Sequence, residues 1–159
     1  MYTVRLAKTD DIPAISALRL AYLKDDFGGE LPAKHEAEIS AQLPAYFAAH
    51  LGRDCFAFTA ELENGRLIAL AILCVMEKPA NLSFPNGKSG TVLSVYTEPA
   101  YRGMGCATAL MTALLEQAKA LHLDIINLSA SDMGRPIYEK LGFTLAHSHF
   151  TEMKFVLHE

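Results

Sequence analysis

Apolar and polar positions alternate at the start of the chain, and apolar positions then recur at helical spacing. Residues 3–6 alternate and predict a short strand. The next apolar residues are three or four positions apart, after Asp10-Asp11-Ile12-Pro13, which predicts a helix that begins with capping carboxylates and a first-turn proline. Residues 25–32 are rich in charge, glycine and proline, as in a loop. Residues 33–50 then predict a second helix, interrupted or bent near Pro44.

Two long apolar segments in the middle of the chain have the pattern of strands. They cover residues 55–63 and 66–77 and are joined by Asn64-Gly65. Asn-Gly between such segments is typical of a two-residue hairpin, because both residues tolerate a positive φ. Residues 78–89 contain two prolines and a glycine, and they predict a loop.

Strands and helices continue to alternate in the second half of the chain. The predicted elements are a strand at 91–97, a helix at 103–122, a strand at 123–128, a helix at 132–141, and closing strands at 143–146 and 150–157. The order β-α-α-β-β-β-α-β-α-β-β predicts an α/β fold. No repeat or linker interrupts it, so we expect a single domain over residues 1–159.

Composition narrows the function classes. The 159 residues suit one globular domain, with 51% hydrophobic and 20% charged residues. A net charge of −4 argues against a nucleic-acid partner, which requires a basic face. The sequence has no run of 18 apolar residues and no signal-like start, so we expect neither membrane association nor export and take the cytoplasm as the location.

Cysteine and histidine spacing gives no indication of a metal site. Cys55, Cys74 and Cys106 lack the paired spacing of zinc ligands or of a disulfide framework, and no His-x-x-x-His pair occurs. We interpret Cys55 and Cys74 as core thiols. Cys106 is a possible nucleophile, but its place favours a small residue at a helix start.

The segment Arg102-Gly103-Met104-Gly105-Cys106-Ala107 lies between a predicted strand and a predicted helix. Unblocked backbone N–H groups at a helix N-terminus, with a cation beside them, suit a phosphate or pyrophosphate. Glycine lets a ligand approach the backbone closely because it has no Cβ. The alternative for such a segment is a glycine-containing turn without a ligand.

Two motifs give the chain a resemblance to the GCN5-related N-acetyltransferase (GNAT) superfamily. Arg102-x-x-Gly105-x-Ala107 matches its phosphate-binding signature Gln/Arg-x-x-Gly-x-Gly/Ala, and residues 137–143 look like its Tyr-Glu-x-x-Gly-Phe segment. The resemblance covers nearly the whole chain, although residues 22–50 match only in helical character. It implies a mixed central sheet of about seven strands with a splayed central pair, flanked by about four helices.

The resemblance also implies direct acetyl transfer from acetyl-CoA to a primary amine in a ternary complex. The amine would belong to a small molecule or to a peptide or protein N-terminus. Residues implied in cosubstrate binding are Val95, Tyr96, Thr97, Arg102, Gly103, Met104, Gly105, Cys106, Ala107, Thr108, Ser131 and Tyr138.

Two of these residues would take part in catalysis. The Val95 N–H would stabilise the oxyanion of the tetrahedral intermediate. Tyr138 would protonate the leaving thiolate, with packing of an amphipathic helix as its alternative role. Ser131 occupies a position often held by an asparagine that touches the pantetheine arm. Some relatives carry a glutamate base where this chain has Thr91. The base would then be an ordered water or a carboxylate such as Glu77 or Glu30, or the acceptor would arrive neutral.

The acceptor is expected to bind between residues 22–50 and the loop 78–89. The candidate lining is acidic and aromatic and favours a cationic amine; it consists of Tyr22, Asp25, Asp26, Glu30, His35 and Glu36. The alternative is an ordinary solvated helix face. A rival function is a non-catalytic acyl-CoA sensor of the same fold, and an apolar edge in the closing strands would allow a homodimer.

Overall fold

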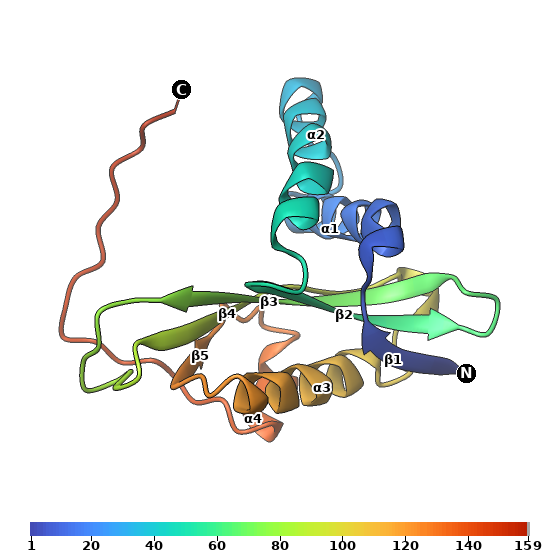
Figure 1. Cartoon of the computed structure of the whole chain (residues 1–159). Coiled ribbons are helices and arrows are strands. Elements are labelled where there is room, and N and C mark those ends of the chain that lie inside the picture. Colours follow the sequence, from blue (N-terminus) through green and yellow to red (C-terminus); the bar gives the residue numbers. More distant parts are fainter. Residues whose placement is uncertain (159) are drawn as a thin grey trace. The chain divides into compact units, whose positions relative to one another are not determined.

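The computed structural model describes residues 1–158, which fall into two units, one up to Ser129 and one from Ala130 onward. Each unit is described by itself. The first unit contains a five-stranded sheet and three α-helices (Figure 1). Its elements are β1 (Tyr2–Leu6), α1 (Ile12–Asp26), α2 (Ala33–His50), β2 (Cys55–Leu62), β3 (Leu67–Glu77), β4 (Lys88–Thr97), α3 (Cys106–Ala120) and β5 (Ile125–Asn127).

The strands lie in sequence order, β1-β2-β3-β4-β5. The first four are antiparallel neighbours, and β5 pairs with β4 in parallel, so the sheet is mixed as predicted. A parallel neighbour requires a crossover, and α3 supplies it. Helices α1 and α2 cover one face of the sheet and α3 covers the other (Figure 1).

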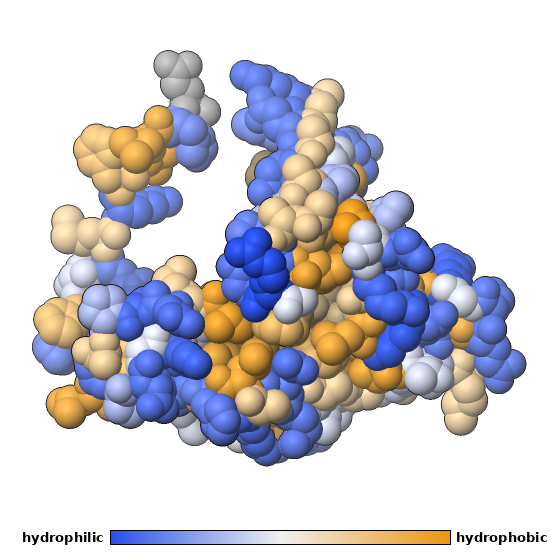
Figure 2. Space-filling view, viewed as in Figure 1, coloured by the Kyte–Doolittle hydropathy of each residue, from blue (hydrophilic) through white to orange (hydrophobic). Residues whose placement is uncertain are grey.

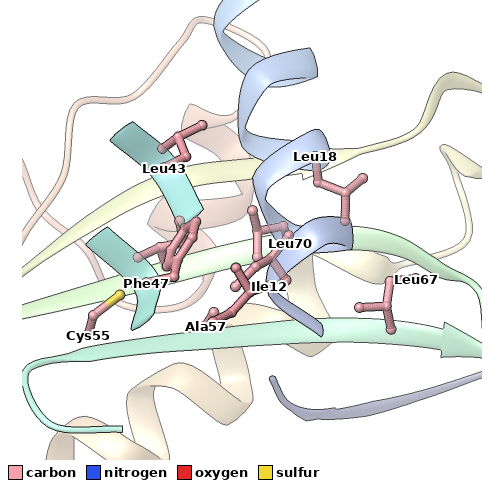
Figure 3. Close-up of a cluster of buried hydrophobic side chains, with 10 residues drawn as sticks. Ile12, Leu18, Leu43, Phe47, Cys55, Ala57, Leu67 and Leu70 are labelled. Atoms are coloured by element: carbon pink, nitrogen blue, oxygen red, sulfur yellow. The ribbon is translucent and has the colours of Figure 1, made fainter. Parts of the chain in front are cut away.

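Apolar side chains from α1 and α2 pack on the middle of the sheet. Figure 3 shows Ile12 and Leu18 of α1 and Phe47 of α2 beside Ala57 and Leu70 of the sheet. All five are buried. Burial of this apolar surface is the main favourable contribution to folding, at about 25 cal/mol per Å². The core therefore fixes α1 against the central strands.

The hairpin after β2 is confirmed, but its predicted two-residue turn is wrong. The loop covers residues 63–66, and Gly65 has a φ of 87° whereas Asn64 is not among the positive-φ residues. The Asn64 side chain instead accepts a hydrogen bond from the Arg66 N–H at 3.0 Å. The connection is therefore a four-residue loop with a side-chain hydrogen bond inside it, in place of a two-residue Asn-Gly turn.

Several boundaries also differ from prediction. The helix expected from residue 103 begins at Cys106, because Gly103 and Gly105 have left-handed backbone angles, with φ values of 82° and 78°. Strand β4 begins at Lys88, three residues early, and its pairing to Glu77 closes the preceding loop. Helix α2 covers the predicted residues 33–50 without interruption at Pro44.

The second unit contains one short helix, α4 (Arg135–Lys140). The predicted strands at 143–146 and 150–157 are wrong, since neither segment has a ladder partner in the part of the chain that is described. Residues 1–158 therefore form five strands where about seven were expected. Alternating apolar residues do not suffice for a strand without a neighbouring edge, because the backbone groups need partners. Phe155 is 87% exposed and Leu157 is 92% exposed, and Figure 2 shows hydrophobic side chains along this segment.

Candidate functional site

Strand β4 contains a bulge beside its carboxyl-terminal end. Leu70 pairs with Tyr96 and Ile72 pairs with Leu93, so Ser94 and Val95 both lie opposite the one residue between them on β3. Ser94 is 2% exposed and has a φ of 55°. A bulge breaks the regular ladder and redirects backbone groups. The backbone around Val95 is thus set apart from the regular hydrogen-bond pattern of the sheet.

Pairing between β4 and β5 stops before this bulge. The last pair is Thr91 with Asn127, and β4 continues to Thr97. Among residues 1–158, no strand pairs with the other edge of β4 from Val92 onward. This edge has unpaired backbone donors and acceptors available for an extended ligand.

The turn between β4 and α3 exposes a row of backbone amides. Gly105 is the N-cap of α3 and supplies no side-chain cap, and the first helical amides cannot bond within the helix. Within residues 1–158, no backbone acceptor faces the N–H groups from Gly103 to Thr108. A Cβ on Gly103 would lie in open space, so the surface in front of this turn is uncovered. Both the free donors and the helix dipole favour an anion here.

Arg102 lies over the end of β4 beside this turn. Its Nε donates to the carbonyl of Thr97 at 3.0 Å, and its guanidinium lies 5.6 Å from the centre of the Tyr96 ring. Its Nη2 is 3.4 Å from Oδ2 of Asp25. The side chain is 48% exposed. The contacts to β4 orient the cation and leave other N–H groups of the fork for a ligand.

Tyr2 of β1 supports the same turn, which the sequence did not indicate. Its hydroxyl donates to the carbonyl of Met104 at 3.1 Å and is 3.8 Å from the position of a Cβ on Gly105. Burial raises the pKa of Tyr2, and burial likewise raises the pKa of Cys106. Cys106 is 3% exposed, which agrees with a packing residue and argues against a nucleophile. No local signal connects residues 2 and 104.

Arg19 of α1 is a second residue that sequence reasoning did not select. Its Nη1 donates to Oγ of Ser94 at 2.5 Å, and its guanidinium lies 5.9 Å from the Tyr22 ring centre. The contact joins α1 to the bulge of β4. In the sequence, Arg19 has only the spacing of a helix position beside the core.

A thiol pair lies next to this contact. Cys55 and Cys74 are opposite each other on β2 and β3, and the Tyr46 hydroxyl is 3.5 Å from Sγ of Cys74. The Cys55 thiol lowers the pKa of Cys74 to about 6 by hydrogen bonding, with further contributions from Tyr46 and the charge of Arg19. The same pairing raises the pKa of Cys55. The core placement predicted for Cys55 is confirmed, while Cys74 is only half-buried.

The expected acidic lining does not form one cluster. Glu36 pairs with Lys24 at 2.5 Å, and His35 lies 3.9 Å from Glu38. Asp25 faces Arg102, as described above. In the described part of the chain, no group of three His, Cys, Asp or Glu side chains is placed to hold a metal ion. Similarly, no helix within residues 1–158 is both long and apolar enough to cross a membrane.

Ser131 and Tyr138 belong to the second unit. The Ser131 hydroxyl accepts a hydrogen bond from the Gly134 N–H at 3.1 Å, before α4. Tyr138 is half-buried on α4, and its ring meets Phe143 edge-on at 6.0 Å between centres. A Cβ on Gly134 would be 3.0 Å from the Tyr138 ring, so this glycine leaves space for the tyrosine.

Three comparisons place these features among known proteins. The chain is similar to a crystal structure described as a predicted acetyltransferase with acetyl-CoA from Clostridium acetobutylicum, with 31% identity, a TM-score of 0.82, and coverage of 97% of this chain and 96% of that one. A GCN5-related N-acetyltransferase from Ralstonia eutropha has 23% identity, a TM-score of 0.79, and coverage of 96% of this chain and 99% of that one, which shows the fold.

Glucosamine 6-phosphate N-acetyltransferase from Trypanosoma brucei brucei is 32% identical over 96 residues, or 59% of this chain. The match spans about 60% of the length of that curated relative. The model of the acetyltransferase (GNAT) family matches residues 20–143. The chain therefore belongs to the acetyltransferase (GNAT) family.

Proposed function

We propose that this protein is an N-acetyltransferase that moves an acetyl group from acetyl-CoA to a primary amine. The observation that carries the proposal is the row of free amides from Gly103 to Thr108, next to the unpaired edge and the bulge of β4. The first feature suits a diphosphate, and the second suits an extended amide-containing arm. Family membership supports acetyl-CoA as the donor, since a similar structure is described with that molecule.

On this proposal, the turn binds the donor through its backbone. The amides from Gly103 to Thr108 donate to the diphosphate, and Arg102 adds a positive charge. The unpaired edge at Val95, Tyr96 and Thr97 bonds the pantetheine arm as a further strand would. This arrangement leaves the thioester beside the bulge.

The chemistry requires an oxyanion donor and an acid. The amine attacks the thioester carbon, its C–N bond forms, and the C–S bond then breaks to release the CoA thiolate. The Val95 N–H donates to the oxyanion, and the Tyr138 hydroxyl gives its proton to the thiolate. The proton lost by the amine passes to water, since Thr91 cannot act as a base at the position where some relatives carry a glutamate.

The acceptor is proposed to be a small-molecule primary amine. The curated relative acts on an amino sugar phosphate according to its name, which supports this class over a protein N-terminus. Glucosamine and glucosamine 6-phosphate are therefore the first acceptors to test, followed by amino acids and polyamines.

The test of the donor site is acetyl-CoA binding by a Gly105→Val variant. We expect the Kd for acetyl-CoA to rise about tenfold or more, because a β-branched residue at the left-handed φ of 78° would strain the turn that presents the amides. Gly52→Val is the matched control, since Gly52 has a similar φ of 84° and open space for a Cβ outside the turn. Equal Kd values for Gly105→Val and the wild type would overturn the diphosphate assignment.

Free-thiol release with an amine panel tests transfer itself. Release that depends on both acetyl-CoA and an amine supports the enzyme. Tight acetyl-CoA binding without release for any amine would instead show a sensor module.

A further inference from the structure

Arg19 places a cation beside the proposed position of acyl transfer. Its hydrogen bond to Ser94 holds the guanidinium at the bulge, one residue from Val95. Helix α1 approaches this point from the face of the sheet that α1 and α2 cover (Figure 1). The guanidinium of Arg19 contacts the bulge of β4, whereas that of Arg102 contacts the end of the strand at Thr97.

The charge of Arg19 has no carboxylate partner among residues 1–158. Arg5, Arg66, Arg102 and Arg135 each lie within 4 Å of an Asp or Glu oxygen, and Arg19 does not. Its recorded contacts are the neutral Ser94 hydroxyl and the Tyr22 ring. A half-buried guanidinium has five N–H donors, and one neutral acceptor leaves most of its hydrogen-bonding capacity unused. Its field also contributes to the lowered pKa of Cys74, after the larger effect of Cys55.

We propose that Arg19 binds an anionic group of the acceptor, so that the preferred substrates are small primary amines that also carry a carboxylate or a phosphate. The guanidinium fork pairs with either anion in a bidentate manner. The inference rests on the proposed function and adds the substrate class. It replaces the expectation of a purely cationic amine, because Asp25 and Glu36, two of the acidic residues behind that expectation, lie in separate ion pairs while the cation lies at the bulge.

Matched acceptor pairs test this proposal. One pair is an α-amino acid and its amide, and the other is an amino sugar phosphate and the unphosphorylated amino sugar; the two pairs distinguish a carboxylate from a phosphate. We expect kcat/KM of the wild type to be at least about tenfold higher for the anionic member of one pair. In Arg19→Gln this preference should disappear, because kcat/KM for the anionic member falls. We expect kcat/KM for the neutral member to change by less than about threefold.

Three further variants separate binding from structural support. Arg19→Lys keeps the charge without the fork and should retain part of the preference. Ser94→Ala removes the contact that holds the guanidinium at the bulge but keeps the cation, and should reduce the ratio between pair members less than Arg19→Gln does. Arg53→Gln is the control, because the Arg53 side chain is exposed and donates to the carbonyl of Ala49, away from β4.

The outcomes differ from those of the donor test. A wild type that acetylates both members of each pair equally overturns the role of Arg19 and leaves the transferase intact. An equal loss for both members in Arg19→Gln also overturns it, since that result marks Arg19 as support for the bulge. If acetyl-CoA binds but no anionic amine is acetylated, the inference fails while the donor site stands. Failure to bind acetyl-CoA overturns the proposed function itself.

Discussion

Single side chains in this protein obtain their chemistry from residues distant in sequence. Cys74 illustrates this, because its thiol lies opposite Cys55 on the next strand and 3.5 Å from the Tyr46 hydroxyl of α2. Donors and a nearby cation favour the charged thiolate, whereas burial opposes it. The result is a lowered pKa, and reactivity follows the thiolate.

Alkylation of Cys74 should therefore reach its plateau at unusually low pH. With a pKa of about 6, the thiolate fraction is half at about pH 6, and the rate should level off above about pH 7. Iodoacetamide labelling followed by peptide mass spectrometry measures this profile. Cys55→Ala removes the principal hydrogen-bond donor and should move the profile to higher pH. A Cys74 profile that still rises through pH 8 would contradict the proposed environment.

Tyr138 provides a test of the acid at the same scale. We expect Tyr138→Phe to lower kcat at least about tenfold and to change the Kd for acetyl-CoA much less, because only the proton donor is lost. The edge-on ring contact with Phe143 does not need the hydroxyl. Single-turnover CoA release and equilibrium binding give the two values. Equal kcat for the variant and the wild type would exclude Tyr138 as the acid.

At the scale of elements, an ion network joins the first strand to the start of α1. The Arg5 guanidinium contacts Asp11 at 2.7 Å and also contacts Glu61 on β2. Asp11 further accepts the Lys8 N–H at 2.7 Å, so the carboxylate expected to cap α1 instead stabilises the turn before it. Arg5 and this backbone N–H lower the pKa of Asp11, although burial acts in the opposite direction.

Replacement of Asp11 by Asn should destabilise the protein by about 1–3 kcal/mol at neutral pH. Since the folded pKa of Asp11 lies below its ordinary value of 3.8, its stabilisation is present above that value and is lost as pH falls through the folded pKa. Urea unfolding at pH 7 and at pH 3 measures both effects. Asp10→Asn is the control, because Asp10 is exposed and lies outside the network. A similar loss in both variants would contradict this assignment.

At the scale of the whole molecule, order follows burial and strand pairing. The central strands β2 and β3 are buried and paired on both sides, whereas residues 143–158 lack ladder partners within the described chain. Local opening is easiest where few buried contacts and hydrogen bonds must break.

Amide hydrogen exchange should reflect this difference. We expect slow exchange across β2 and β3 and exchange within seconds to minutes across residues 150–157. Peptide-level exchange with mass spectrometry measures it, and Leu70 and Leu157 lie in peptides at the two extremes. Strong protection of residues 150–157 in the free protein would contradict the unpaired state.

The sequence by itself determined much of the first unit. Helical spacing located α2 at residues 33–50, and the glycines at 103 and 105 located the strand-to-helix turn with its free amides. These are local properties, because periodicity and backbone freedom act within a few residues. The family resemblance came from the same local motifs and is confirmed.

Only the tertiary structure decided which distant residues meet. It placed Tyr2 against the turn, Arg19 against the bulge and Cys55 opposite Cys74, and it left residues 150–157 without an edge to pair with. Strand pairing and packing join segments whose separation in sequence carries no local signal, and a segment with strand-like alternation forms a ladder only where a partner edge is available.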